Sequence, residues 1–343
     1  MTLTLTINAE RWRAHQRTIQ AEVPGLIPVI KGNGYGFGLR TLAAEAARLG
    51  VAAVAVGIAQ EVDAVRAGGW DGDIVVLNPW RPFDTLATSQ LSDPRIIATV
   101  SRPEDLRELG GRTPRPRVIL ELLTSMKRHG LAPSEVPRAD IDGVTFEGWA
   151  CHLPKSGDLE EAHFLSATAL GPDAAEPLPT FWYSHLSVGA YGGLEYSGGK
   201  RMRVGTRLWL GDKQAYSTTG HVLDVHRIKK GERLGYHQHK APKDGFIVVV
   251  SGGTSHGIAL QAPTSAQSLK ARGVTVAEGV LDALGRSLSP FTIGGKKRPF
   301  AEPPHMHSSM VFVPGDNALV KVGDEVPVTT RMTTTTPDEI RWA

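Results

Sequence analysis

The chain has 343 residues, 41% of them hydrophobic and 21% charged, which is ordinary for a soluble globular protein and long enough for two domains. Its 38 Lys and Arg residues nearly balance 35 Asp and Glu residues, so the net charge of +3 does not favour nucleic acid as a partner. No window approaches the roughly 18 apolar residues of a membrane span, so no membrane segment is expected.

From about residue 25 to residue 212, short apolar runs alternate with amphipathic stretches. The predicted strands cover residues 26–30, 51–56, 73–77, 95–100, 117–123, 144–150, 180–183 and 204–208. The predicted helices between them cover residues 39–49, 60–67 and 103–109. Strands that alternate with helices favour a parallel sheet, and this length suits an α/β fold of the (β/α)8 TIM-like barrel type.

After residue 212 the pattern changes to strands separated by Gly and Pro. The predicted strands there cover residues 216–225, 246–250, 273–277, 310–313 and 325–330. This part is expected to form a mainly β domain, to which residues 2–8 add a strand. The predicted organisation is therefore residues 1–12 with the β domain, residues 13–212 as the barrel, and residues 213–343 as the C-terminal β domain.

The first chemically distinctive segment is Pro28-Val-Ile-Lys31-Gly-Asn-Gly-Tyr35-Gly-Phe-Gly38. An apolar strand here delivers a lysine at its C-terminal end, the end at which barrels of this type carry their chemistry. Partial desolvation there would lower the pKa of the lysine and free its amine to form an imine with an aldehyde. Taken by itself, the segment could equally be a strand followed by a glycine-rich turn.

The segment resembles the lysine motif of the alanine racemase family, and the likeness continues in order along the chain. Further matching stretches are residues 54–61, 123–131, 146–152, 186–187, 202–205, 233–236 and 304–306. The resemblance implies a barrel followed by a β domain, called fold type III of the pyridoxal-phosphate enzymes. It also implies pyridoxal 5′-phosphate as the cofactor and a small-molecule amino acid as the substrate.

The resemblance assigns the cofactor to the barrel. Lys31 would hold pyridoxal phosphate covalently, while Tyr35, Ser187 and the backbone N–H of Gly205 would bind its phosphate. Arg203 would face the pyridine nitrogen. Since an arginine does not give up its proton, that nitrogen would stay unprotonated.

The resemblance also implies two proton carriers on opposite faces of the substrate, Lys31 and Tyr236, as racemisation requires. His152 would link Arg203 to Tyr236 and belong to the cofactor-binding set. Arg128 would lie near the cofactor's phenolic oxygen and the substrate carboxylate, which Met306 would help to hold. In the family the tyrosine comes from the partner subunit, so a homodimer with shared active sites is expected.

Several positions depart from the family pattern. Glu121 stands where many members have a lysine, often carbamylated, that positions the residue equivalent to Arg128. Thr254 stands where a gate tyrosine is usual, and the C-terminal segment ending at Ala343 is shorter than usual and lacks a late gate tyrosine. These changes suggest a wider entrance and a substrate not restricted to alanine.

Alternative functions remain open from the sequence. A decarboxylase would need an acid opposite the pyridine nitrogen and a cysteine in the β domain, and a non-catalytic pyridoxal-phosphate carrier would consist of the barrel alone. A metal-assisted dehydratase or aldolase could use the pairs His237/His239 or His305/His307, although no metal is expected.

The single cysteine bears on the compartment. Cys151 has no second cysteine in the chain with which to form a disulfide. This composition fits a reducing environment, and the N-terminal residues show no signal-peptide pattern. A cytoplasmic location is therefore expected.

Overall fold

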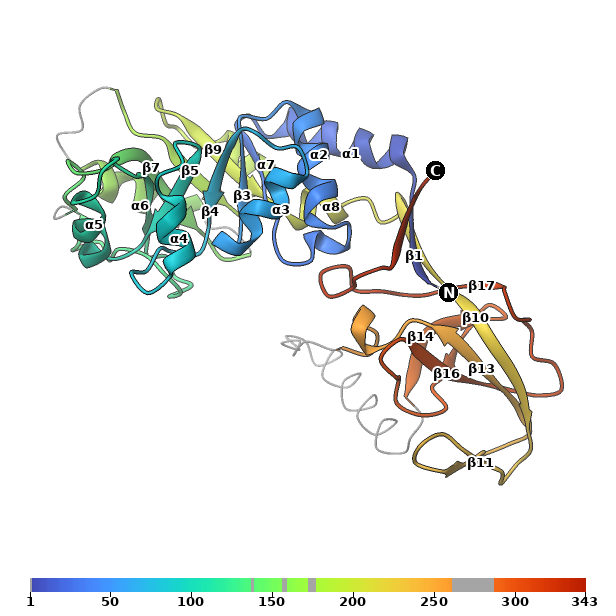
Figure 1. The fold of residues 1–343 in the computed structure, drawn as a ribbon. Coiled ribbons are helices and arrows are strands. Elements are labelled where there is room, and N and C mark those ends of the chain that lie inside the picture. The colour runs from blue at the N-terminus through green and yellow to red at the C-terminus, as the bar shows by residue number, and fades with distance from the viewer. Residues whose placement is uncertain (1, 137–138, 156–158, 172–176, 261–286) are drawn as a thin grey trace. The chain divides into compact units, whose positions relative to one another are not determined.

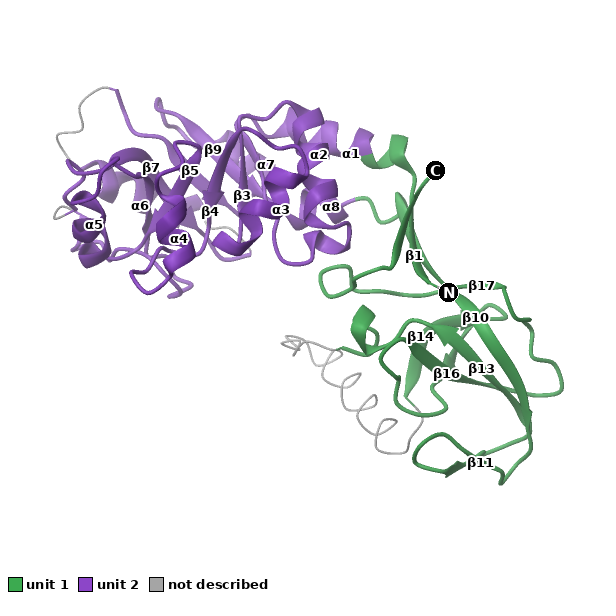
Figure 2. Ribbon diagram, in the orientation of Figure 1, with its two compact units in different colours: residues 1–12, 212–343 green, residues 13–211 purple. Residues whose placement is uncertain are grey.

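The computed structural model describes residues 2–136, 139–155, 159–171, 177–260 and 287–343. The chain divides into two compact units, coloured in Figure 2. Unit 1 comprises Met1–Trp12 and Asp212–Ala343, and unit 2 comprises Arg13–Gly211. The predicted strand at residues 273–277 lies outside the described residues.

Unit 2 contains an eight-stranded parallel sheet in the order β2-β9-β8-β7-β6-β5-β4-β3 (Figure 1). The strands are β2 (Leu26–Pro28), β3 (Ala53–Val56), β4 (Asp73–Val76), β5 (Ile96–Val100), β6 (Arg117–Leu122), β7 (Thr145–His152), β8 (Phe181–Ser184) and β9 (Lys200–Val204). A parallel bridge between Val29 and Ala55 brings the two ends of the sheet together. The sheet is therefore a nearly closed barrel, and the predicted fold class is confirmed.

Helices connect the strands, as parallel pairing requires. They are α1 (Ala9–Glu22), α2 (Leu39–Leu49), α3 (Val62–Ala67), α4 (Thr85–Gln90), α5 (Pro103–Gly110), α6 (Leu159–Leu170), α7 (Val188–Gly192) and α8 (Thr206–Leu210), with 3-10 turns η1 (Gly34–Gly36) and η2 (Ala59–Glu61). Helix α2 buries Leu42, Ala43 and Ala46, the apolar face given by its helical spacing.

The barrel interior is filled by apolar side chains, as expected for this fold. They are Ile27, Val29, Ala53, Ala55, Val75, Ile97, Ile119, Ala150 and Trp182, with Leu77 packed against them. This packed layer closes the barrel below the ends of the strands, so polar side chains beyond it form the floor of any site.

The predicted strand at residues 204–208 is wrong. The last barrel strand, β9, ends at Val204, and helix α8 begins at Thr206 after Gly205. The backbone N–H groups of Leu208 and Trp209 both donate to the Gly205 carbonyl. A short apolar run does not by its periodicity distinguish a strand from a buried helical turn, and here the tertiary packing of Leu208 and Trp209 favours the helix.

Unit 1 is mainly β structure, with a sheet in the order β16-β13-β10-β1-β18 and β17 paired to β10. Its strands are β1 (Leu3–Ile7), β10 (Tyr216–Ile228), β13 (Gly245–Ser251), β16 (Ser308–Pro314), β17 (Glu325–Pro327) and β18 (Glu339–Trp342). Two hairpins accompany this sheet: β11 (Arg233–Leu234) with β12 (His239–Lys240), and β14 (Leu288–Ile293) with β15 (Lys296–Pro299).

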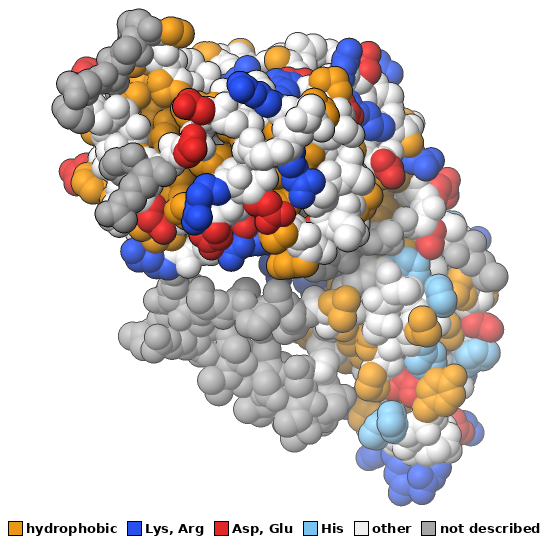
Figure 3. Space-filling model, turned by 60° about the vertical axis from the view of Figure 1, so that its left-hand side comes forward, with side chains coloured by type: hydrophobic (Ala, Val, Ile, Leu, Met, Phe, Trp, Pro, Cys, Tyr) orange, Lys and Arg blue, Asp and Glu red, His pale blue; other side chains and the backbone are white. Residues whose placement is uncertain are grey.

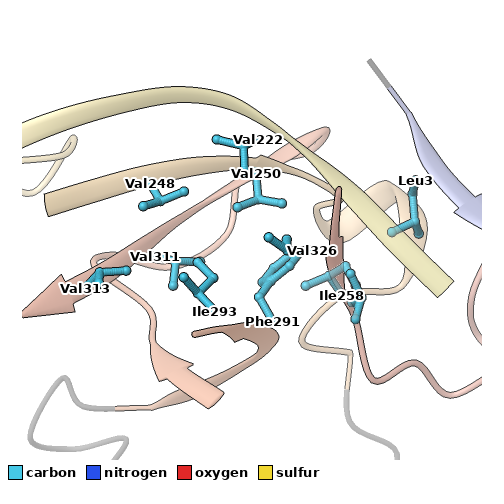
Figure 4. Packing of buried hydrophobic residues seen from close by; sticks show 11 residues of the cluster. Leu3, Val222, Val248, Val250, Ile258, Phe291, Ile293, Val311, Val313 and Val326 are labelled. Carbon is cyan, nitrogen blue, oxygen red and sulfur yellow. The ribbon is translucent and has the colours of Figure 1, made fainter. Parts of the chain in front are cut away.

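The N-terminal strand β1 pairs with β10 in antiparallel and with β18 in parallel fashion, so the two ends of the chain meet in one sheet. The core of the unit is rich in valine and is shown in Figure 4. It consists of Leu3, Val222, Val248, Val250, Ile258, Phe291, Ile293, Val311, Val313, Val326 and Val328. A second, smaller cluster contains Leu234 and Ala241, which lie on either side of Tyr236 in the chain.

Candidate active site

Four of the polar residues singled out in the sequence gather at the C-terminal end of the barrel strands. Lys31, Glu121 and His152 each lie two residues beyond an apolar member of the interior layer, so alternation along a strand directs them to the same side. Arg203 lies near the end of β9 and is buried. The barrel mouth thus carries a lysine, an arginine, an imidazole and a carboxyl group.

Lys31 lies in a tight backbone setting. Glu61, at the end of η2, accepts hydrogen bonds from the backbone N–H groups of Gly32 and Gly57, both at 2.6 Å. A Cβ atom on Gly57 would lie 3.2 Å from the Cβ of Lys31, so the two chain segments pass close to each other. By its overall accessibility Lys31 is exposed, yet partial burial of its amine lowers its pKa. The charge of Arg128 and then that of Arg203 lower the pKa further, whereas the charge of Glu61 opposes this shift.

Arg203 is held inside the barrel by backbone carbonyls. Its guanidinium donates to the carbonyl oxygens of Cys151, Trp182 and Tyr183 at 3.2, 3.3 and 3.5 Å. Burial lowers its pKa, an effect that the nearby carboxyl of Glu121 opposes. Since a guanidinium keeps its proton in proteins, Arg203 places a fixed positive charge in the floor of the mouth.

Glu121 is a buried carboxyl group whose charge acts on Arg203. Its side chain is 3% exposed, and its Oε1 lies 3.9 Å from the guanidinium of Arg128. The other oxygen, Oε2, is buried and has no hydrogen-bond partner among the described residues. Burial raises the pKa of Glu121, and the charges of Arg203, Arg128 and Arg81 oppose that rise. The structure therefore brings Glu121 and Arg128 together.

His152 ends β7 and is fixed by a neighbour on β8. Its Nδ1 lies 3.0 Å from the hydroxyl of Ser184, and its ring centroid lies 5.0 Å from that of His185. Burial, followed by the charges of Arg203 and Arg128, lowers the pKa of His152 to about 2. The imidazole is therefore neutral at physiological pH, and beside Arg203 it can take part in hydrogen bonds without carrying a charge.

Tyr35 and Gly205 meet at one side of the mouth. Tyr35 is buried, adopts a left-handed φ of 54°, and its hydroxyl lies where a Cβ on residue 205 would be. Burial raises the pKa of this phenol, so it remains a hydrogen-bond donor. Ser187 caps α7 by accepting from the Ala190 backbone N–H at 3.1 Å, and it is exposed.

The remaining two predicted residues belong to unit 1. Tyr236 lies in the hairpin between β11 and β12 with 83% of its surface exposed, and Met306 is 65% exposed in the loop before β16. They come from separate loops of the unit, and the hydroxyl of Ser255 donates to the Met306 carbonyl at 2.5 Å. Both side chains are free to contact another molecule.

Three polar residues near the site, Glu61, Ser184 and His185, were not predicted from the sequence. Glu61 lies in a matching stretch, but its two backbone contacts become visible only in three dimensions. Ser184 ends β8 and His185 follows it, and His185 has a left-handed φ of 66°, which is unusual for a residue other than glycine. The position of polar residues just after a barrel strand is the signal that could have identified them.

A separate cavity of about 220 Å³ lies on the outer side of β4 and β5, against α4. Its lining includes Ile58, Trp80, Phe83 and Gln90 but none of the predicted site residues. Within the part of the chain that the structure describes, no cluster of three or more His, Cys, Asp or Glu residues could hold a metal ion, and no helix is long and apolar enough to cross a membrane. The titratable groups of the mouth therefore define the candidate site.

The sequence of the chain is similar to those of known alanine racemases. The family profile described as alanine racemase, N-terminal domain, matches residues 7–205, which is more than half of the chain. The alanine racemase of Halorhodospira halophila is 28% identical over 76% of this chain and 76% of its own. The alanine racemase of Leptospira interrogans is 27% identical over 47% of this chain, and the match spans less than half (42%) of that protein's length.

Comparison with solved structures gives the same architecture over the whole chain. Alanine racemase from Bartonella henselae, solved with covalently bound pyridoxal phosphate, superposes with a TM-score of 0.74. The match covers 99% of both chains at 17% sequence identity. At this identity the likeness shows the shared fold.

Proposed function

The chain belongs to the alanine racemase family, and we propose that it is a pyridoxal-phosphate-dependent amino-acid racemase with Lys31 and Tyr236 as its two proton carriers. The observation that carries the proposal is the barrel mouth, where a lysine of lowered pKa lies among Arg128, Arg203 and a neutral His152. A lysine in this setting can attach an aldehyde, and its neighbours can hold anionic groups.

The residues of the mouth fit the cofactor. Only a glycine at position 205 leaves room for the Tyr35 hydroxyl, and a phosphate could bind to this hydroxyl together with Ser187 and the Gly205 N–H. The permanent charge of Arg203, fixed by three carbonyl groups, would face the ring nitrogen. When bound, pyridoxal phosphate supplies the electron sink that allows an amino acid to lose its α-proton.

The protein would move that proton with two groups. Lys31 would hold it on one face of the substrate, and the phenol of Tyr236 would hold it on the other. Arg128, braced by Glu121, would bind the substrate carboxylate, with Met306 beside it. His152 would join the hydrogen bonds around Arg203 because its imidazole is neutral.

The proposed assembly is a homodimer in which Tyr236 of each copy completes the site of the other. Two-fold symmetry would then form both sites at once. A substrate range beyond alanine is supported by Thr254, whose short side chain stands beside the loop of Met306: its backbone N–H donates to the His305 carbonyl at 2.9 Å. Light scattering on the active protein tests the assembly, and a fully active monomer would contradict it.

The decisive experiment combines cofactor trapping with a substrate panel. We expect borohydride reduction to fix pyridoxal phosphate on Lys31, as located by mass spectrometry, and α-protons of one or more amino acids to exchange with deuterium by NMR. Lys31→Ala should abolish both signals, whereas Lys213→Ala at an exposed position should leave them unchanged. Trapping at a different lysine, or exchange with no amino acid, would refute the proposal.

A further inference from the structure

A buried carboxylate lies beneath Tyr236 in unit 1. The side chain of Glu302 is 1% exposed, and its Oε2 accepts the backbone N–H of Tyr236 at 2.7 Å. A Cβ on Gly235 would overlap this carboxylate, so the backbone of the hairpin lies in direct contact with it. A carboxylate in such a place is stable only when its oxygens are hydrogen-bonded.

The second oxygen of Glu302 holds an imidazole. Nε2 of His305 lies 2.7 Å from Oε1, and the His305 ring centroid lies 4.9 Å from that of Tyr236, with the rings tilted by 49°. One carboxylate therefore contacts both the backbone of the tyrosine and the ring that packs against its side chain. A carboxylate that accepts a hydrogen bond from the Nε2–H group also fixes the imidazole in one tautomer.

The backbone around His305 is fixed as well. Its N–H donates to the Ser308 carbonyl and its own carbonyl accepts from Thr254, both at 2.9 Å. Tyr236, by contrast, lies on a two-stranded hairpin and is largely exposed. The rigid partner in the ring contact is thus His305. Figure 3 shows several histidine side chains on the same unit.

We propose that Glu302, His305 and Tyr236 form a carboxylate–imidazole–phenol unit in which His305 is the positioning residue that orients the Tyr236 phenol for proton transfer. As in other acid–histidine pairs, the buried carboxylate fixes the imidazole, but here the imidazole acts through its ring, which packs against the ring of Tyr236. The inference rests on the proposed function insofar as Tyr236 carries a proton, but the contact itself lies wholly within unit 1.

Face-specific exchange in deuterated water tests the unit in the cofactor-loaded protein. His305→Gln keeps an N–H that can donate to Glu302 but removes the ring, and Glu302→Gln keeps the volume but removes the charge. Both variants should slow exchange at the enantiomer that faces Tyr236 by about tenfold or more, mainly in kcat, and spare the enantiomer that faces Lys31. His239→Gln, at an exposed position of β12, is the matched control.

NMR of protein labelled with ¹³C-tyrosine supplies a second readout that needs neither cofactor nor turnover. The wild type should show contacts between the rings of Tyr236 and His305, and His305→Gln should leave the Tyr236 ring conformationally averaged. If the wild type exchanges no α-proton at all, the proposed function fails and this measurement alone decides the inference. An equally ordered Tyr236 ring in His305→Gln, or an equal loss of exchange on both faces, would overturn it.

Discussion

The two groups of site residues differ in how the protein holds them. In the barrel mouth, Arg203 and Glu121 are buried at the ends of paired strands, and burial shifts the pKa of each. In unit 1, Tyr236 and Met306 project from loops and are mostly exposed. The barrel therefore holds its charged groups in a fixed arrangement, whereas the loops of unit 1 expose two groups that, in the proposed dimer, the second copy would cover.

The difference has a consequence for mutations. A change in the mouth disturbs packed neighbours, so it should alter stability, cofactor affinity and activity together. Removal of the Tyr236 hydroxyl should leave the fold and the cofactor untouched and affect proton transfer alone, because the side chain is 83% exposed and its ring contact with His305 is kept. Variants in the mouth and variants at Tyr236 can therefore separate the effects on stability and cofactor binding from the effect on proton transfer.

The largest expected effect comes from Tyr236→Phe, which removes one hydroxyl group from an exposed ring. Cofactor attachment and the free energy of unfolding should stay at wild-type values, while racemisation falls by about 10²- to 10⁴-fold, the usual contribution of a positioned acid or base. Exchange in deuterated water should persist for the enantiomer that faces Lys31. Unchanged racemisation would mean that another group is the second proton carrier.

Gly205→Ala is the next largest expected effect and concerns the mouth alone. The new Cβ would occupy the place of the Tyr35 hydroxyl, and such overpacking costs about 1–3 kcal/mol. We expect cofactor affinity, measured by fluorescence titration, to fall by roughly 5- to 150-fold at that cost. Gly192→Ala is the control, because a Cβ there would meet no atom within 4 Å. Equal affinities for both variants would remove Gly205 from the cofactor site.

Regular periodicity made most of the barrel predictable. The helix predicted at residues 39–49 agrees with α2 in both bounds, since its apolar spacing is helical throughout. The 14-residue helix α1 was not predicted. The Thr/Leu/Ile alternation of the first residues indicates a strand, but this strand ends at Ile7 and α1 begins at Ala9. The strand β9 was missed because its sequence, Lys-Arg-Met-Arg-Val, is mostly basic, and the prediction fell on the residues after it, which form α8.

The site divides along the same line. The place of Lys31 follows from a local rule, an apolar strand with a glycine-rich turn after it, and is visible in the sequence. The contacts of Glu61 with Gly32 and of Glu302 with His305 depend on how loops fold back, and neither the alternation of apolar residues nor a family motif encodes them. Sequence therefore predicts which residues line the mouth better than it predicts what holds them there.

Glu121→Gln should have an intermediate effect on the KM for the amino acid. The substitution removes the negative charge of the side chain and keeps its size. The amide fits the same space but no longer pairs with Arg128, which would lose its nearest carboxylate at 3.9 Å. We expect the KM for the amino acid to rise by about tenfold, roughly 1.4 kcal/mol, with a smaller change in kcat. Glu135→Gln, in the loop after β6, is the control. A change confined to kcat would argue that Glu121 does not act through Arg128.

The smallest expected effect is a pH dependence of stability that His152 of the mouth contributes between pH 7 and pH 5. The pKa of His152 is about 2 in the folded chain against an ordinary 6.5. Between these values the unfolded chain binds a proton that the folded chain rejects, so the free energy of unfolding should fall as the pH drops below about 6.5. The ceiling is about 1.4 kcal/mol per pH unit, and partial exposure of His152 reduces it.

Urea unfolding at pH 7 and pH 5 measures this dependence. The comparison is between wild type, His152→Gln and the exposed unit 1 variant His239→Gln. His152→Gln should lose part of the decrease in stability between the two pH values, whereas His239→Gln should keep it in full. His129 and His185, whose pKa values burial also lowers, would maintain the remainder. Identical pH dependence in all three proteins would show that the mouth does not hold His152 in its neutral form, and the electrostatic contrast between the two units would not extend to this residue.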